Sequence, residues 1–152
     1  MIRKKSTFNP ISNFNQAVKK LSNIGLRPTK QRVVLIKLLF ENPDRHISAE
    51  ELFEEVRKEN TKISLATIYN SLKQFTKIGL LKELVVDQNK SIYCTNHDPH
   101  YHLYIEDEGK VIDIPQKNID LNIPEIPACL SLHNIDIIVR VITLKDKYKT
   151  II

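Results

Sequence analysis

The chain has little of several things that mark particular classes of protein. Its 152 residues include two cysteines, three glycines and no tryptophan. Two cysteines cannot build a disulfide framework, which favours a reducing, cytoplasmic location. No apolar run is long enough to cross a bilayer, so we expect no membrane partner. The basic start, Met1–Ser6, leads into no apolar segment, so we expect no signal peptide.

Enzyme motifs are missing as well. The sequence contains no HExxH, GxSxG or P-loop motif, and three glycines leave little material for a nucleotide-binding loop. A metallohydrolase built on a His-x-His pair would need further ligands downstream, where His133 is the only histidine. We therefore expect a protein that is not an enzyme. A metal-dependent enzyme remains the less favoured alternative.

Charge is unevenly divided along the chain. Residues 1–86 hold 16 Lys and Arg against 8 Asp and Glu, whereas residues 87–152 hold 7 against 10. A basic first half suits a polyanion, because each neutralised phosphate releases condensed counterions. A solvated basic surface without a partner is the other interpretation.

Apolar spacing in the first half predicts four helices. They span residues 13–25, Thr29 to Phe40, Ser48 to about Asn60 and Ser64 to Gly79. Ser48 and Glu51 have the spacing of a capping box, in which each side chain satisfies a backbone N–H of the helix start. Segments 80–86 and 91–94 then predict a hairpin around a turn at 87–90.

The fourth predicted helix has a composition suited to a major groove. One side is an apolar stripe, and the opposite side is almost free of acidic groups; it carries Thr67, Asn70, Ser71, Gln74 and Lys77. A hairpin that directly follows such a recognition helix is a wing. The first half therefore predicts a winged-helix DNA-binding domain whose partner is double-stranded DNA.

The second half predicts a small sheet. Strands are expected at 101–106, 110–114 and 135–144, and the prolines of residues 115–132 allow only a short helix. Such a sheet is too small to bury its apolar face alone, which predicts a homodimer. The fold class is α+β: a winged-helix domain in 1–86 with a wing strand extending to 94, a wing and hinge in 87–99, and a small α/β dimerisation and metal-sensing domain in 100–152.

Three of the five histidines lie close together in the sequence. His100 and His102 share one face of a strand because side chains alternate. If the following turn is the two residues Glu108–Gly109, Asp113 lies opposite Tyr104 and on that same face. Two imidazoles and a carboxylate can hold a divalent transition metal. The alternative is a polar loop that contains histidine, and nearby Cys94 is either a thiolate ligand or a small core residue.

Four motifs together carry a family resemblance. Gly25–Arg32, His46–Leu52, Ser64–Asn70 and His100–His102 occur in the order seen in the ferric uptake regulator superfamily. Within it, the chain most resembles the iron response regulator branch, with the peroxide regulators next. The resemblance implies a winged helix, a hinge, a dimerisation domain, and a metal-responsive repressor that binds palindromic operators as a homodimer. A metal-independent winged-helix regulator remains the alternative.

The resemblance also implies metal sites. The regulatory site carries over to His46, Cys94, His100, His102 and Asp113, although a carboxylate is usual where Cys94 stands. A second site would use Asp120 and His133, with His97 or Asp98 as substitutes for residues that are missing here. A four-cysteine zinc site is absent, because its positions hold Ile105 and Glu108. The expected metal is Fe²⁺, Zn²⁺ or Mn²⁺; haem has no Cys-Pro regulatory motif here and would have to use the histidines.

On DNA, the resemblance implies that Tyr69 and Asn70 lie at base edges. The same surface would include Ser64 and Thr67 at the start of the fourth helix. Phosphate contacts are expected from basic residues that precede it in the chain, namely Arg27, Lys30, Arg32 and an N-terminal arm at Arg3–Lys5.

Overall fold

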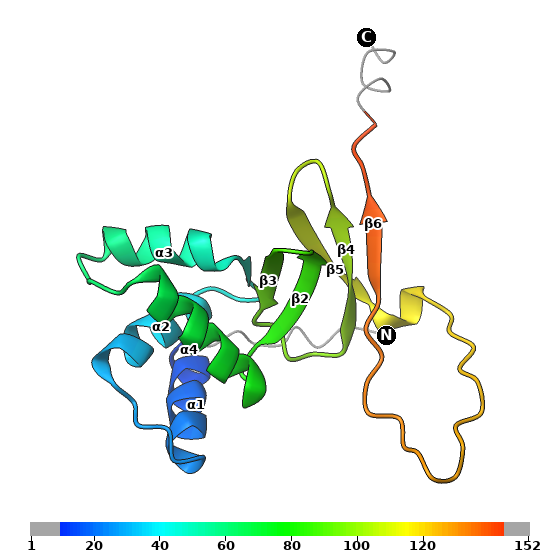
Figure 1. The fold of residues 1–152 in the computed structure, drawn as a ribbon, viewed down its shortest axis with the longest axis horizontal. Coiled ribbons are helices and arrows are strands. Elements are labelled where there is room, and N and C mark those ends of the chain that lie inside the picture. Colours follow the sequence, from blue (N-terminus) through cyan, green and yellow to red (C-terminus); the bar gives the residue numbers. More distant parts are fainter. Residues whose placement is uncertain (1–9, 145–152) are drawn as a thin grey trace. The chain divides into compact units, whose positions relative to one another are not determined.

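The structure is a computed structural model that describes residues 10–144, with side chains from residue 13 onward. The chain forms two compact units, Met1–His97 and Asp98–Ile152. Helices dominate the first and a small sheet forms the second, as Figure 1 shows for each unit by itself. The expected α+β fold class is confirmed.

The four expected helices are present in the first unit, and side-chain caps set where three of them start. These are α1 (Pro10–Asn23), α2 (Lys30–Phe40), α3 (Ala49–Lys58) and α4 (Leu65–Lys77). Thr29 and Ser64 each accept a hydrogen bond from a backbone N–H in the first turn of their helix. Ser48 and Glu51 form the predicted capping box. The cap residues read from the sequence are therefore confirmed.

Positive backbone angles end two of these helices. Gly25 and Gly79 both have φ of +78°, a conformation that a residue without Cβ adopts without strain. Two boundaries differ from expectation. The first helix starts at Pro10 instead of residue 13, since proline suits a first helical turn. The third helix ends at Lys58, before Asn60, whose φ of 52° is left-handed.

The wing has one strand more than the sequence predicted. Its strands β2 (Lys82–Asp87) and β3 (Lys90–Cys94) form the expected hairpin, with a tighter turn than the expected 87–90. A two-residue strand, β1 (His46–Ile47), adds to the other side of β3, so the sheet order is β1-β3-β2. Two residues are too few for a periodic pattern, which is why this strand was not predicted.

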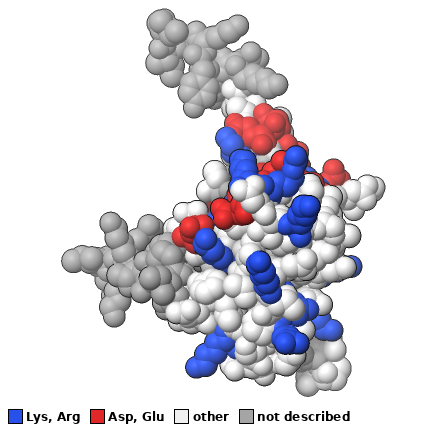
Figure 2. Space-filling model, turned by 90° about the vertical axis from the view of Figure 1, so that its left-hand side faces the viewer, with Lys and Arg blue, Asp and Glu red and all other residues white. Residues whose placement is uncertain are grey.

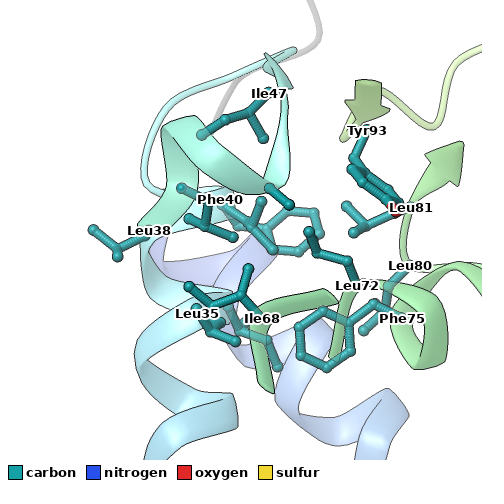
Figure 3. Packing of buried hydrophobic residues seen from close by; sticks show 14 of the residues in the cluster. Leu35, Leu38, Phe40, Ile47, Ile68, Leu72, Phe75, Leu80, Leu81 and Tyr93 are labelled. Atoms are coloured by element: carbon teal, nitrogen blue, oxygen red, sulfur yellow. The ribbon is translucent and has the colours of Figure 1, made fainter. Parts of the chain in front are cut away.

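A single apolar core joins the helices of the first unit to its wing. Figure 3 shows Leu35 of α2, Ile68 and Phe75 of α4 and the wing residue Tyr93 converging on the same interior. Ile68 and Phe75 are fully buried, as the apolar stripe of α4 predicted. Because α4 is fixed to this core by that stripe, its opposite side is left to solvent.

The second unit is built on a three-stranded sheet of mixed direction. Strand β4 (His100–Ile105) lies in the middle, antiparallel to β5 (Lys110–Pro115) and parallel to β6 (Ile138–Val141). A 3₁₀ turn, η1 (Gln116–Asn118), follows β5. The last strand, Ile138–Val141, is shorter than the expected 135–144, because residue-by-residue pairing with β4 extends over these four residues.

The β4–β5 register also corrects the sequence reading. His102, not Tyr104, lies opposite Asp113, and the connection runs from Ile105 to Lys110 instead of through two residues. The shift is two positions along the strand. Since side chains repeat every two residues, Asp113 stays on the predicted face of the sheet.

Candidate metal centre and DNA-facing helix

The two histidines of β4 meet through their outer ring nitrogens. The Nε2 atoms of His100 and His102 are 2.8 Å apart, and the rings are set edge to face with centroids 4.4 Å apart. Both side chains are buried, His102 at 1 % exposure. Two imidazoles brought together in this way, away from solvent, can direct two nitrogen ligands at one point.

Asp113 completes a three-donor group within the second unit. Its Oδ1 lies 3.3 Å from Nε2 of His100 and 3.6 Å from Nε2 of His102. The antiparallel register places it directly across from His102. Two nitrogens and one carboxylate oxygen form a donor set that first-row divalent metals accept.

The protonation of His100 suits a ligand role. Its Nδ1 lies 2.5 Å from the backbone carbonyl of Asp98. A carbonyl oxygen only accepts hydrogen bonds, so Nδ1 carries the proton and a neutral ring leaves a lone pair on Nε2. Metal-binding histidines characteristically donate their other N–H to a carbonyl or carboxylate in this manner. The residues therefore fit a divalent metal.

The first unit has a pair of donors of its own. His46 of β1 and Cys94 of β3 are directly paired across the wing sheet, with ligand atoms within 4.8 Å of each other. The Cys94 side chain is 1 % exposed and forms no disulfide. His46 and Cys94 are far apart in the sequence, and the pairing of the unpredicted strand β1 with β3 brings them side by side. All five residues predicted for the regulatory site lie in these two donor groups.

The residues of the possible second site are not gathered. The His97 ring is stacked on Phe40, and its Nε2 is 2.9 Å from the carbonyl of Leu80. Asp120 and His133 are exposed. Within residues 10–144, the one group of three or more potential metal-binding side chains contains neither of them, nor His97 or Asp98.

The exposed face of α4 differs in part from the predicted one. Ser71 is buried, and Gln74 accepts a hydrogen bond of 3.0 Å from the Arg32 guanidinium. The side chains that are exposed follow helical spacing along one stripe: Ala66, Tyr69, Asn70, Lys73 and Lys77. Burial of Ser71 in the core shifts the exposed stripe toward Lys73, a residue that the sequence pattern did not single out.

The remaining DNA-contact candidates lie at helix starts. The hydroxyl oxygens of Ser64 and Thr67 are 2.9 Å apart and share a hydrogen bond at the start of α4. Arg27 and Lys30 are exposed, whereas Arg32 is half-buried and also donates to the Arg27 carbonyl. The Arg3–Lys5 arm lies outside the described residues.

On one face of the molecule, basic side chains are spread out and do not form a single block. On the face drawn in Figure 2, Lys and Arg side chains are separated by uncharged residues, and acidic side chains occupy a smaller area. This distribution agrees with the basic balance of residues 1–86. A dispersed positive surface can follow the regularly spaced phosphates of a duplex.

One acidic residue that the sequence did not single out contacts the exposed face of α4. The Tyr69 hydroxyl donates a hydrogen bond to the Glu50 carboxylate of α3. This bond raises the pKa of the Tyr69 phenol, with burial and the Glu50 charge as lesser causes. Burial, aided by nearby acidic charge, raises the pKa of Tyr93 in the wing to about 12. Both phenols therefore keep their protons at neutral pH.

No helix in residues 10–144 is long and apolar enough to cross a membrane.

Comparison with known proteins points to one family. The sequence profile of the ferric uptake regulator family matches residues 23–140. The peroxide-responsive repressor PerR of Staphylococcus aureus (strain Mu50 / ATCC 700699) is 34 % identical over 105 residues, which cover 68 % of this chain and 70 % of that protein.

Solved structures are similar over most of the chain. The ferric uptake regulator of Vibrio cholerae has a TM-score of 0.66 and 27 % identity, and the match covers 83 % of this chain and 98 % of that one. The regulator of Pseudomonas aeruginosa, solved with manganese, has a TM-score of 0.65 over 84 % of this chain and 97 % of its own; at 23 % identity it supports the fold alone.

None of these relatives is described as an iron response regulator, so that narrower assignment stays a prediction. The profile match spans most of the chain, and the Staphylococcus aureus relative aligns over two thirds of it. This chain belongs to the ferric uptake regulator family of metal-responsive transcriptional regulators.

Proposed function

We propose that the chain is a cytoplasmic, homodimeric regulator that binds palindromic operator DNA in response to a divalent metal, in iron or peroxide regulation. The observation that carries this proposal is the division of the donor side chains. His100, His102 and Asp113 belong to the second unit, and His46 and Cys94 belong to the first. A ligand set divided in this way suits a sensor, because occupancy can restrain one unit against the other.

The first unit is built to pass such a restraint to its DNA-facing helix. His46 lies in β1, two residues before Ser48, the cap of α3. Helix α3 in turn packs against α4. A bound cation would supply positive charge and directional bonds to the five side chains. A restraint on His46 in β1 would therefore be transmitted through the capped helix α3 to the recognition helix α4.

Restraining both winged helices of a dimer would select one spacing of the two α4 helices. Half-sites about 34 Å apart, one turn of DNA, are the usual match for a two-fold protein. Metal need only favour the competent arrangement by ~1–3 kcal/mol to change DNA affinity roughly 5–150-fold. In this proposal the chain has no catalytic role.

The donor set limits which metals can bind but does not select a single one. Imidazole nitrogens and a carboxylate accept zinc, ferrous iron or manganese. The buried thiol of Cys94 favours zinc or ferrous iron over manganese as a partner, because thiolate is a soft ligand.

Metal titration together with DNA selection tests the proposal. Zinc and manganese are titrated calorimetrically into metal-free protein, and the protein selects duplexes from a randomised library with and without metal. We expect one metal per chain, a palindromic selected sequence, and tighter binding to it with metal present. The His100→Ala/His102→Ala double variant should lose the metal and the metal response.

His133→Ala is the matched control, since this histidine is exposed and outside the donor groups. Unchanged metal stoichiometry in the double variant would remove the proposed site. Sequence-selective DNA binding that ignores metal would instead support a metal-independent winged-helix regulator. Metal binding with no DNA preference would favour the enzyme alternative.

A further inference from the structure

The surface proposed to face DNA contains a carboxylate in contact with its central aromatic side chain. Tyr69 is 39 % exposed near the middle of the α4 stripe. Glu50, itself exposed in the first turn of α3, accepts a hydrogen bond from the Tyr69 hydroxyl although the two residues are 19 positions apart. A negative charge here opposes the attraction between this basic unit and phosphate. Its position therefore requires another explanation.

The hydrogen bond restrains the orientation of an otherwise mobile side chain. An exposed tyrosine on a helix samples several rotamers, and ordering it at an interface opposes binding. A charge-assisted bond to a carboxylate is shorter and stronger than a neutral one. Glu50 lies in the capped first turn of α3, so the backbone that carries its carboxylate is ordered and the hydrogen bond limits the rotamers of Tyr69.

The bond also determines what the hydroxyl can offer to a base. A phenol has one O–H donor, and here its hydrogen bond goes to the Glu50 carboxylate, in agreement with the raised pKa of Tyr69. The oxygen can then only accept a further hydrogen bond. In the major groove the donors are the amino groups of adenine and cytosine, whereas guanine presents only acceptors at N7 and O6.

We propose that Glu50 is a positioning and specificity-determining residue, which holds the Tyr69 ring and makes its hydroxyl an acceptor toward amino-bearing bases. This inference rests on the proposed DNA-binding function. The negative charge of Glu50 lowers affinity for DNA of any sequence, and the orientation of Tyr69 in return increases the preference for particular sequences. Without Glu50 the Tyr69 O–H has no acceptor on α3, so that Tyr69 can also donate to guanine or thymine oxygens.

The test compares base preferences of full-length variants. Duplexes are selected from a randomised library by the wild type and by Glu50→Ala, Glu50→Gln and Tyr69→Phe, and affinities for selected and random DNA are measured. Glu50→Ala should lower discrimination by about tenfold, the effect of one mismatched base pair, while affinity for random DNA rises. Glu50→Gln keeps an acceptor for the phenol and should retain most of the preference, although it loses the same charge.

Glu54→Ala is the matched control, because it removes an exposed carboxylate from the same helix, one that is paired with Arg57 instead of Tyr69. Thermal unfolding establishes that each variant is folded. Unchanged base preferences in Glu50→Ala, or equal losses in Glu50→Gln and Glu50→Ala, would overturn the positioning role and leave Glu50 as a charge only. A wild type that selects no sequence would overturn the proposed function and this inference with it.

Discussion

Among single residues, His46 has the most separable role, because it is the one imidazole of the donor set outside the second unit. His100, His102 and Asp113 form a group without it. We therefore expect His46→Ala to keep substantial metal affinity but to lose most of the roughly 5–150-fold metal dependence typical of such coupling. Calorimetry and DNA-binding assays on the same protein measure the two effects.

His97→Ala is a suitable comparison for that substitution, since His97 is a histidine of the first unit outside the donor group. Its loss should leave metal affinity intact. A His46→Ala variant that loses all metal binding, or one that keeps the full response of DNA binding to metal, would contradict the proposed role of His46.

Among the elements, α4 presents basic charge that is independent of its base-reading side chains. Lys73 lies on the exposed stripe, one helical turn after Tyr69 and Asn70. We expect Lys73→Ala to weaken binding to specific and random DNA alike and to reduce the slope of log affinity against log salt by about one. Lys58→Ala, an equal charge change at the end of α3, should alter the slope less. Equal slopes for both variants would show that α4 does not face the phosphates.

The elements also show how far sequence patterns reach. Thr29, Ser48 and Ser64 act where predicted, because a helix cap is a local interaction within four residues. The pairing of His46 with Cys94 could not be read, since nothing in a two-residue strand signals a distant partner. His46 was placed in the site only through the family resemblance.

The difference between local patterns and contacts between distant elements also explains which parts of the metal centre and of the DNA-facing surface could be predicted. Asp113 was assigned to the correct side of β5 despite a wrong register, because side-chain alternation tolerates a shift of two. The contact between Glu50 and Tyr69 was missed, since it depends on how α3 packs against α4. Contacts between elements depend on tertiary packing, which periodicity does not specify.

For the whole molecule, apolar exposure in the second unit predicts self-association. Ile142 and Leu144 are 66 % and 60 % exposed beside the sheet, and Ile112 of β5 is 53 % exposed. We expect a dimer at micromolar concentration, and Ile142→Asp should shift it toward monomer because a carboxylate in an apolar interface loses hydration. Sedimentation velocity measures the distribution. Ile24→Asp, at an exposed position of the first unit, is the comparison and should remain dimeric.

The position of β6 at one edge of the described sheet has a consequence for aggregation. An apolar edge strand offers unpaired backbone groups to any extended chain that it meets. The one charged residue of β6 is Arg140, whose guanidinium lies 5.7 Å from the centre of the Tyr104 ring and 3.0 Å from Glu106. A fixed charge in the middle of such an edge discourages indiscriminate strand addition. We therefore expect Arg140 to limit the addition of extended strands from other copies to this edge of the folded sheet.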